Sequence, residues 1–201
     1  WSLLKRSRLS SVAPSIVVFI DLALTGGLHL DGLADSADGL FAHVPAKDRL
    51  KIMSEPEVGT FGVVALIASL IARRDGLDAI EPSPLVLACV LCASRSLMVL
   101  GMCTLPSARR DGLASGLIPS DNRFGPSFLV ALGSMGASVL LAFLARGRRG
   151  ANGLLAGLVA GAGVLVLGRR RLGGYTGDVL GASGAVVEAV ALLAMSKRPT
   201  V

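Results

Sequence analysis

The sequence predicts an all-α membrane protein, a bundle of about six transmembrane helices that forms one domain over residues 1–201. Three observations indicate this class. Of the 201 residues, 52% are hydrophobic and only 17% are charged, and the mean hydropathy is +0.67. Apolar runs, several close to the roughly 20 residues that span hydrocarbon, follow one another along the chain. Lysine and arginine gather in short clusters at the ends of these runs, as in proteins that cross a membrane several times.

The basic composition does not indicate a nucleic-acid partner. The formal net charge is +6, but the basic clusters contain no interleaved aromatic residues of the kind on which bases stack. The lipid bilayer is therefore the partner that the composition predicts. A homo-oligomer is compatible with the sequence, which does not decide the oligomeric state.

Six apolar runs account for the predicted helices. They cover residues 11–30, 59–72, 84–102, 126–145, 151–168 and 179–195. In the fifth run, glycines recur at positions 153, 157 and 161, a spacing that lets helices approach closely in lipid. Because the chain opens at Trp1 rather than methionine, we expect an N-terminal segment to be missing, and the family resemblance described below implies that this segment holds a further helix.

Alternation of six spans places three connectors on one side of the bundle. These connectors cover residues 31–58, 103–125 and 169–178 and hold nearly all of the chemically interesting polar residues. The opposite side receives both termini, the pair 73–74 and the arginine cluster 146–149. The two sides carry similar numbers of basic residues, so the positive-inside rule assigns no orientation.

The stretch 25–41 holds the strongest chemical signal. Asp31, Asp35 and Asp38 lie at i, i+4 and i+7, so a helix presents all three on one face. Like charges four residues apart destabilise a bare helix, and the next basic residue is Lys47. A metal site explains the pattern better than a solvated face, which usually carries interspersed basic residues.

This acidic face offers only oxygen ligands, which indicates Mg²⁺, an ion that keeps several waters and binds substrate phosphates. Asp31 and Asp35 are one turn apart and can bind one ion, whereas Asp38 lies about 10 Å from Asp31 along a straight helix. Asp35 could bridge two ions, or the helix could break at one of its glycines. On a continuous helix His29 points away from the acidic face, which favours a supporting or packing role over ligation.

Polar residues near the last run form a second candidate region. Segment 173–178 leads into that run, and the free backbone N–H groups of a helix N-terminus can bind an anion. The alternative is that Thr176 or Asp178 simply caps the helix. Glu188 lies inside the run, where an unpaired carboxylate is costly, and Arg95 is its expected partner. Asp21 is also ionisable and inside an apolar run, and its role stays open.

Five stretches, taken together, resemble a known family. They are 25–41, 48–53, 59–62, 109–117 and 173–182, and they occur in order over nearly the whole chain. With them the sequence is similar to the cobalamin synthase family, adenosylcobinamide-GDP ribazoletransferase. The resemblance implies a multi-pass enzyme of the cell inner membrane that depends on Mg²⁺, with its active side expected to be cytoplasmic. Such an enzyme joins adenosylcobinamide-GDP to α-ribazole, or to its 5′-phosphate, and releases GMP.

The resemblance also implies a set of site residues. Asp31, Asp35 and Asp38 match the acidic motif and are expected to bind the metal and to act in catalysis. The expected substrate-binding residues are His29, Arg49, Glu55, Arg109, Arg110, Thr176 and Asp178. The three arginines of this set are candidate phosphate contacts. Glu55 stands where the family often has aspartate, and Glu57 stands where a basic residue is expected, which weakens the case that this loop binds phosphate.

Two other functions are compatible with clustered acids in a membrane bundle. A CDP-alcohol phosphotransferase also uses grouped aspartates, but its Asp-x-x-Asp-Gly-x-x-Ala-Arg spacing is absent. A cation transporter would place Asp21, Arg95 and Glu188 along a path between matching halves of the chain. The sequence shows no such internal repeat.

Overall fold

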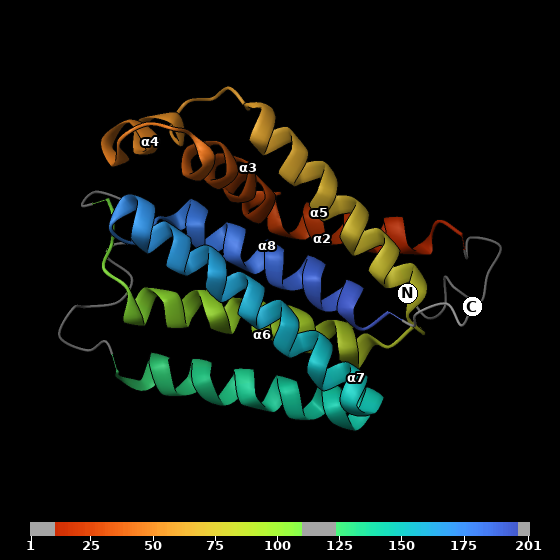
Figure 1. The fold of residues 1–201 in the computed structure, drawn as a ribbon. Coiled ribbons are helices and arrows are strands. Elements are labelled where there is room, and N and C mark those ends of the chain that lie inside the picture. Colours follow the sequence, from red (N-terminus) through yellow and green to blue (C-terminus); the bar gives the residue numbers. More distant parts are fainter. Residues whose placement is uncertain (1–10, 110–123, 197–201) are drawn as a thin grey trace.

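The computed structural model describes residues 11–109 and 124–196, and Figure 1 shows their arrangement. The elements are α2 (Ala13–Thr25), α3 (Leu28–Phe41), α4 (Ala46–Ile52), α5 (Thr60–Ala79), α6 (Pro84–Thr104), α7 (Pro126–Leu172) and α8 (Gly177–Ala194). Outside the helices, the described residues form a single isolated β-bridge, between Ser107 and Tyr175. The all-α prediction is confirmed.

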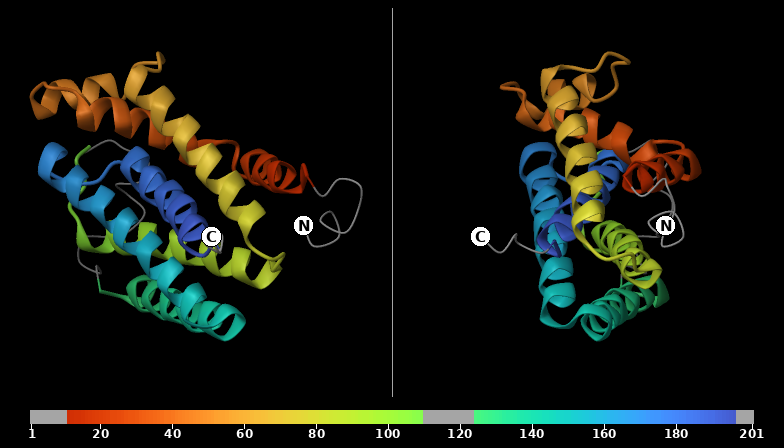
Figure 2. Two further views of the ribbon diagram at one scale, coloured as in Figure 1. Left: turned by 45° about the vertical axis from the view of Figure 1, so that its right-hand side comes forward. Right: turned by 90° about the vertical axis from the view of Figure 1, so that its right-hand side faces the viewer.

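Helix α8 lies at the centre of the bundle and packs against α3, α5, α6 and α7 (Figure 2). The most extensive contact is with α7, where glycines remove the side chains that would separate the two backbones. A Cβ atom at Gly157 would lie 2.6 Å from the carbonyl oxygen of Val187, and one at Gly161 would lie 2.5 Å from the Val187 side chain. Such close packing replaces the hydrophobic drive that is absent between helices in lipid. The structural interpretation of these glycines is confirmed.

Helix α7 is broken at Gly147, whose dihedral angles of φ 61° and ψ −149° are not helical. A positive φ of this kind is readily adopted only by glycine. The chain reverses direction at this point, as Figure 1 shows. The two halves of α7 therefore contain the predicted runs 126–145 and 151–168 as an antiparallel pair.

The first predicted run, 11–30, is not one straight span. Gly26 and Gly27 both have positive φ, 61° and 72°, and donate hydrogen bonds to Ala23 and Leu22 in a helix-ending turn. Helix α2 stops there, and α3 leaves at an angle of 89°. The acidic stretch is consequently a helix of its own rather than part of a connector.

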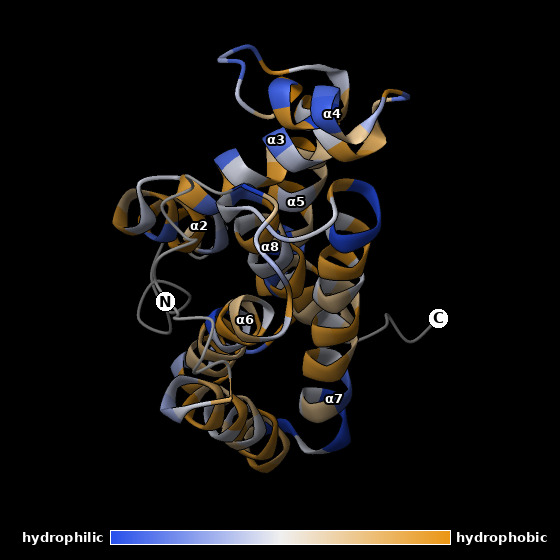
Figure 3. Cartoon of the chain, turned by 90° about the vertical axis from the view of Figure 1, so that its left-hand side faces the viewer, coloured by the Kyte–Doolittle hydropathy of each residue, from blue (hydrophilic) through white to orange (hydrophobic). Residues whose placement is uncertain are grey.

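The helices have the lengths and surfaces expected of a membrane protein. Among the described residues, α6, α7 and α8 are long and apolar enough to cross a bilayer, and the bent pair α2–α3 makes a fourth candidate if it counts as one span. Side chains such as Val64, Ile67 and Ile71 of α5 are exposed and apolar, and apolar segments dominate the long helices in Figure 3. The number six itself stays a prediction.

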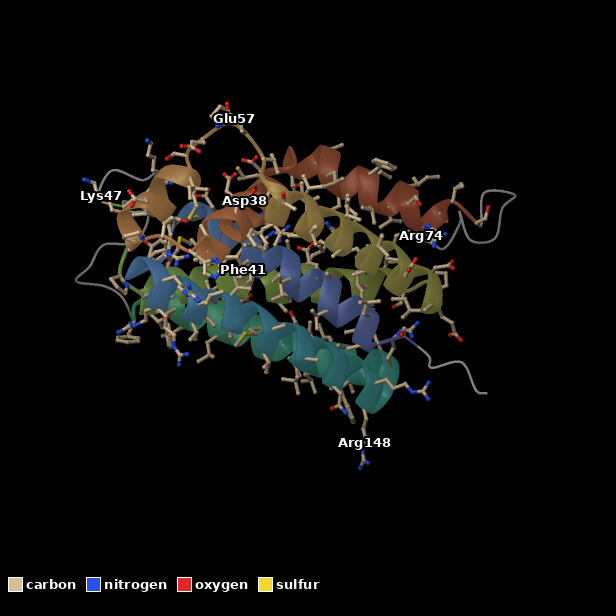
Figure 4. The ribbon with its side chains drawn as sticks, turned by 45° about the horizontal axis from the view of Figure 1, so that its top comes forward. Asp38, Phe41, Lys47, Glu57, Arg74 and Arg148 are labelled. Carbon is tan, nitrogen blue, oxygen red and sulfur yellow. The ribbon has the colours of Figure 1, made fainter. Side chains whose placement is uncertain are left out.

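The polar connectors meet at one end of the bundle, as alternation predicts. Arg109, after α6, donates a hydrogen bond to the carbonyl of Leu50 in α4, and Ala108 donates one to Tyr175, before α8. Lys47 lies at this end in Figure 4, whereas Arg74 and Arg148 lie toward the other end. Three segments that are far apart in sequence are thereby brought into direct contact.

Candidate active site

The acidic helix α3 is pressed against the first turn of α8. A Cβ atom at Gly32 would lie 2.8 Å from the carbonyl oxygen of Asp178 and 2.9 Å from its Cα atom. Only a residue without a side chain allows the two backbones to approach so closely at this point. The contact adds Asp178 to the aspartates of α3, a grouping that the periodicity of one helix cannot reveal.

Asp35 is the centre of this group. It is partly buried, and it interacts electrostatically with Asp31, Asp38, Asp178 and Arg109. Helix α3, which carries Asp35, is too short to span a membrane by itself. Burial, followed by the charges of the other aspartates, raises the pKa of Asp35 to about 6. Among the described residues, four carboxylates and one guanidinium interact here, and a bound cation would neutralise this surplus of negative charge.

Thr176, Asp178 and Arg109 form the other side of the group. The Thr176 hydroxyl accepts a hydrogen bond from the backbone of Val179 at 3.2 Å and donates one to Asp178 at 3.3 Å. The Arg109 guanidinium lies 4.0 Å from the Asp178 carboxylate. Thr176 therefore caps α8, as one of the two sequence interpretations proposed. Contact of these residues with a substrate phosphate stays a prediction.

Asp38 has a structural role that its spacing in the sequence does not reveal. Its two carboxylate oxygens accept hydrogen bonds from the backbone N–H groups of Gly59 at 2.7 Å and Gly62 at 2.9 Å. These groups belong to the N-terminus of α5, where a negative charge is favourable. A Cβ atom at Gly59 would lie 2.5 Å from the carboxylate, so the glycines make room for it. Metal binding by Asp38, labelled in Figure 4, stays a prediction.

The remaining predicted residues are distributed around the group. Arg49 is buried, and its guanidinium donates hydrogen bonds to the carbonyls of Gly39 at 3.1 Å and Leu40 at 2.7 Å, near the end of α3. Glu55 is exposed in the connector between α4 and α5, and Arg110 lies outside the described residues. The phosphate contacts expected of both arginines, and a substrate contact by Glu55, stay predictions.

The aspartates do not form a closed metal cage. In the described part of the chain, no three His, Cys, Asp or Glu side chains lie close enough together to hold one ion. Mg²⁺ does not require such a cage, because it commonly binds one or two carboxylates and completes its shell with water and substrate phosphate. The donor chemistry of Asp31 and Asp35, with the surplus negative charge around them, fits that mode of binding.

The model of the family described as cobalamin-5-phosphate synthase matches residues 1–196 of the sequence. The chain belongs to this family. It is a transferase of cobalamin synthesis. Three of the stretches that resemble the family meet at this site. They contain Asp31–Asp38 of α3, Gly59–Gly62 at the start of α5 and Tyr175–Asp178 at the start of α8, which lie in contact.

Three relatives illustrate the similarity, and each is named adenosylcobinamide-GDP ribazoletransferase. The chain is 37% identical to the protein of Rhizobium etli, a match that covers 92% of this chain and 73% of the relative. It is 37% identical to that of Chlorobium phaeobacteroides, over 88% and 72% of the two chains. It is also 37% identical to that of Stutzerimonas stutzeri, over 90% and 73%. No solved structure matches the chain.

A second group of charges lies inside the bundle of this family member. Glu188 of α8 binds Arg95 of α6 at 2.6 Å, which confirms the expected pair, and binds Arg73 of α5 at 3.1 Å. Arg73 also binds Asp21 of α2. We name these four residues the interior ion network. The predicted run 59–72 puts Arg73 just beyond its end, but α5 continues to Ala79 and buries it.

His29 lies beside the interior ion network rather than at the aspartates. It begins the first turn of α3, where its Cα atom would lie 3.3 Å from a Cβ atom at Gly181. The charges that act on it belong to Arg95, Glu188, Asp21 and Arg73. This position agrees with the expectation that His29 points away from the acidic face. The network also gives Asp21 and Glu188 partners inside the bundle.

Proposed function

We propose that this protein is a Mg²⁺-dependent adenosylcobinamide-GDP ribazoletransferase, which joins adenosylcobinamide-GDP to α-ribazole, or its 5′-phosphate, and releases GMP. The observation that carries the proposal is the surplus of carboxylates where α3 meets α8, beside Arg109. A diphosphate ester is itself strongly negative, so acids at its binding site indicate a bridging cation. The names of the relatives support the same substrate.

In the reaction, the ribazole hydroxyl oxygen bonds to the phosphorus that carries cobinamide, and the bond from that phosphorus to the bridging oxygen of GMP breaks. Asp31 and Asp35 would hold Mg²⁺. When bound there, the ion would neutralise charge on the diphosphate and stabilise the displacement. One carboxylate of the group accepts the hydroxyl proton. Arg109 contributes positive charge to the departing GMP phosphate.

The proposed location is the inner membrane, with the acidic group at the cytoplasmic side. The long apolar helices support a multi-pass membrane protein, and nucleotide substrates are available in the cytoplasm. The acidic group lies at one end of the bundle, where the polar connectors meet, rather than inside the apolar centre. That position is accessible to soluble substrates from one side of a bilayer.

The direct test measures GMP release from adenosylcobinamide-GDP and α-ribazole by membranes that contain the protein. We expect release with Mg²⁺ and none after chelation with EDTA, with recovery when Mg²⁺ is restored. Release without added acceptor would indicate hydrolysis rather than transfer, so the corrinoid product is measured in parallel. Absence of the joined product from membranes that contain folded protein would overturn the proposal.

A further inference from the structure

The buried residue of helix α4 is a charged one. Arg49 is 6% exposed and is the only residue of α4 that is buried, whereas Lys47 and Lys51 on the same helix are exposed. A buried guanidinium is costly unless hydrogen bonds compensate it. The burial of Arg49 therefore indicates specific partners inside the protein.

The partners of Arg49 are backbone carbonyls at the end of α3. Its Nη1 atom donates hydrogen bonds to the carbonyl of Gly39 at 3.1 Å and to that of Leu40 at 2.7 Å. In the last turn of a helix, carbonyl groups lack partners within the helix, and a positive charge is favourable. The last turn of α3 carries no basic residue of its own. Arg49 provides that charge from α4.

Helix α4 needs such contacts to keep its place. It has seven residues and no side-chain hydrogen bond at its N-cap, and a helix this short is marginal by itself. Met53, directly after α4, is 2% exposed, and a Cβ atom at Gly39 would overlap its side chain. Arg49 and Met53 together hold α4 against the end of α3, where Figure 1 shows it.

Helix α4 in turn holds Arg109. The Arg109 guanidinium donates a hydrogen bond at 3.1 Å to the carbonyl of Leu50, the residue that follows Arg49. The same guanidinium lies 4.0 Å from Asp178 and acts on Asp35. Because the Arg109 side chain is 34% exposed, it would sample many positions if nothing held it. The Leu50 carbonyl therefore helps to decide where this positive charge lies.

Arg49 itself is not paired with the aspartates. Among the described residues, no carboxylate forms an ion pair with it, and the cation that acts on Asp35 is Arg109. The contacts of Arg49 thus connect it to the acidic group indirectly, through α4 and Arg109.

We propose that Arg49 is a positioning residue of this transferase, which holds α4 on the end of α3 so that the Leu50 carbonyl keeps the Arg109 guanidinium beside Asp178. In this role Arg49 does not touch the substrate phosphate, and its loss reduces activity because Arg109 loses its place. The inference rests on the proposed function, in which Arg109 contributes positive charge to the departing GMP phosphate.

The test is a double-mutant cycle on formation of the joined product, with kcat/KM for adenosylcobinamide-GDP expressed per folded protein. Arg109→Ala should lower kcat/KM about 100-fold, and Arg49→Ala about tenfold, because it misplaces the same group rather than removing it. The double variant should then match Arg109→Ala alone within about twofold. Lys51→Ala is the matched control, since it removes an exposed cation from the same helix, and it should match wild type.

Arg49→Lys keeps a cation for the two carbonyls and covers the case in which Arg49→Ala does not fold, as thermal unfolding in detergent shows. It should lose less activity than Arg49→Ala, and nothing further when Arg109 is already alanine. Losses that multiply in the double variants would overturn the inference, because a phosphate contact of Arg49 or a purely structural role acts whether or not Arg109 is present.

Hydrogen exchange gives a readout that does not depend on the reaction. The backbone amides of residues 46–53 should exchange faster in Arg49→Ala than in wild type or Lys51→Ala, and equal exchange in the three proteins would overturn the inference. Absence of the joined product in wild type would overturn the proposed function, and this inference with it. Multiplied losses in an active wild-type background would overturn the inference alone.

Discussion

The two groups of charges in this protein differ in their balance. Near Asp35, the described residues include three further aspartates and one arginine that act on it, at the end of the bundle where the polar connectors meet. In the interior ion network, two acids meet two arginines, and the side chains of Glu188 and Arg73 are only 3% and 6% exposed. In the described residues the first group is unbalanced, whereas the second is balanced and has two nearly buried members.

This difference separates a reactive site from a structural one. Charges that are paired within the protein are satisfied by folding, and removing one member leaves its partners buried without compensation. Negative charges in surplus need a compensating cation that the protein itself does not supply. The comparison therefore predicts that substitutions in the interior ion network reduce stability, whereas substitutions near Asp35 reduce activity.

The largest expected effect is on stability. Replacing Glu188 with alanine leaves Arg73 and Arg95 without their shared carboxylate, which should cost about 3–5 kcal/mol. Chemical or thermal unfolding in detergent measures the loss. Unchanged stability would show that the network is not the structural group that its balance indicates.

The next effect is on catalysis. The Asp35→Asn variant should fold normally and lose about 100-fold in kcat, about 2.7 kcal/mol of transition-state stabilisation, because it removes a carboxylate from the centre of the acidic group. Asp75→Asn is the matched control, since Asp75 is an exposed acid on α5. If both variants were equally active, the acidic group would not be the active site.

Substitution of Asp38 tests whether one carboxylate contributes both to stability and to activity. Replacing Asp38 with alanine removes a cap from α5 and should cost about 1–2 kcal/mol of stability. If Asp38 also binds metal, Asp38→Ala will in addition raise the Mg²⁺ concentration for half-maximal activity, by about tenfold or more. A loss of stability with an unchanged Mg²⁺ requirement would limit Asp38 to capping.

The smallest effect is expected for the exposed pair of Arg74 and Asp75, which lie 2.7 Å apart. Solvent screens such pairs, and they contribute little. Arg74→Gln should therefore change neither the unfolding temperature nor GMP release beyond experimental error. A marked loss in either measurement would contradict the distinction between paired charges inside the bundle and paired charges on its surface.

The sequence predicted the parts of this arrangement that follow from local periodicity. The acidic face of α3, the pair of Glu188 and Arg95, and the meeting of the connectors at one end were all foreseen. The acidic face rests on a regular spacing and the meeting of the connectors on the alternation of spans, whereas the pair rests on the cost of an unpaired carboxylate inside a span. The capping of α5 by Asp38 could not be foreseen, because a contact between groups 21 and 24 residues apart leaves no local pattern.

Two further features were missed for identifiable reasons. The apolar composition continues across Gly26 and Gly27, so hydropathy showed one run where the backbone turns through 89°. The double glycine was the available signal for this break. Arg73 was assigned to a helix end because charge usually marks one, but Asp21 and Glu188 compensate its charge inside the bundle.

Helix α8 carries a member of each charged group, Asp178 in its first turn and Glu188 ten residues later, about 15 Å along its axis. The close packing of its backbone on Gly157 and Gly161 of α7 prevents it from sliding. Helix α8 therefore fixes the distance between the acidic group and the interior ion network. An insertion of a single residue between them would rotate one group by 100° relative to the other.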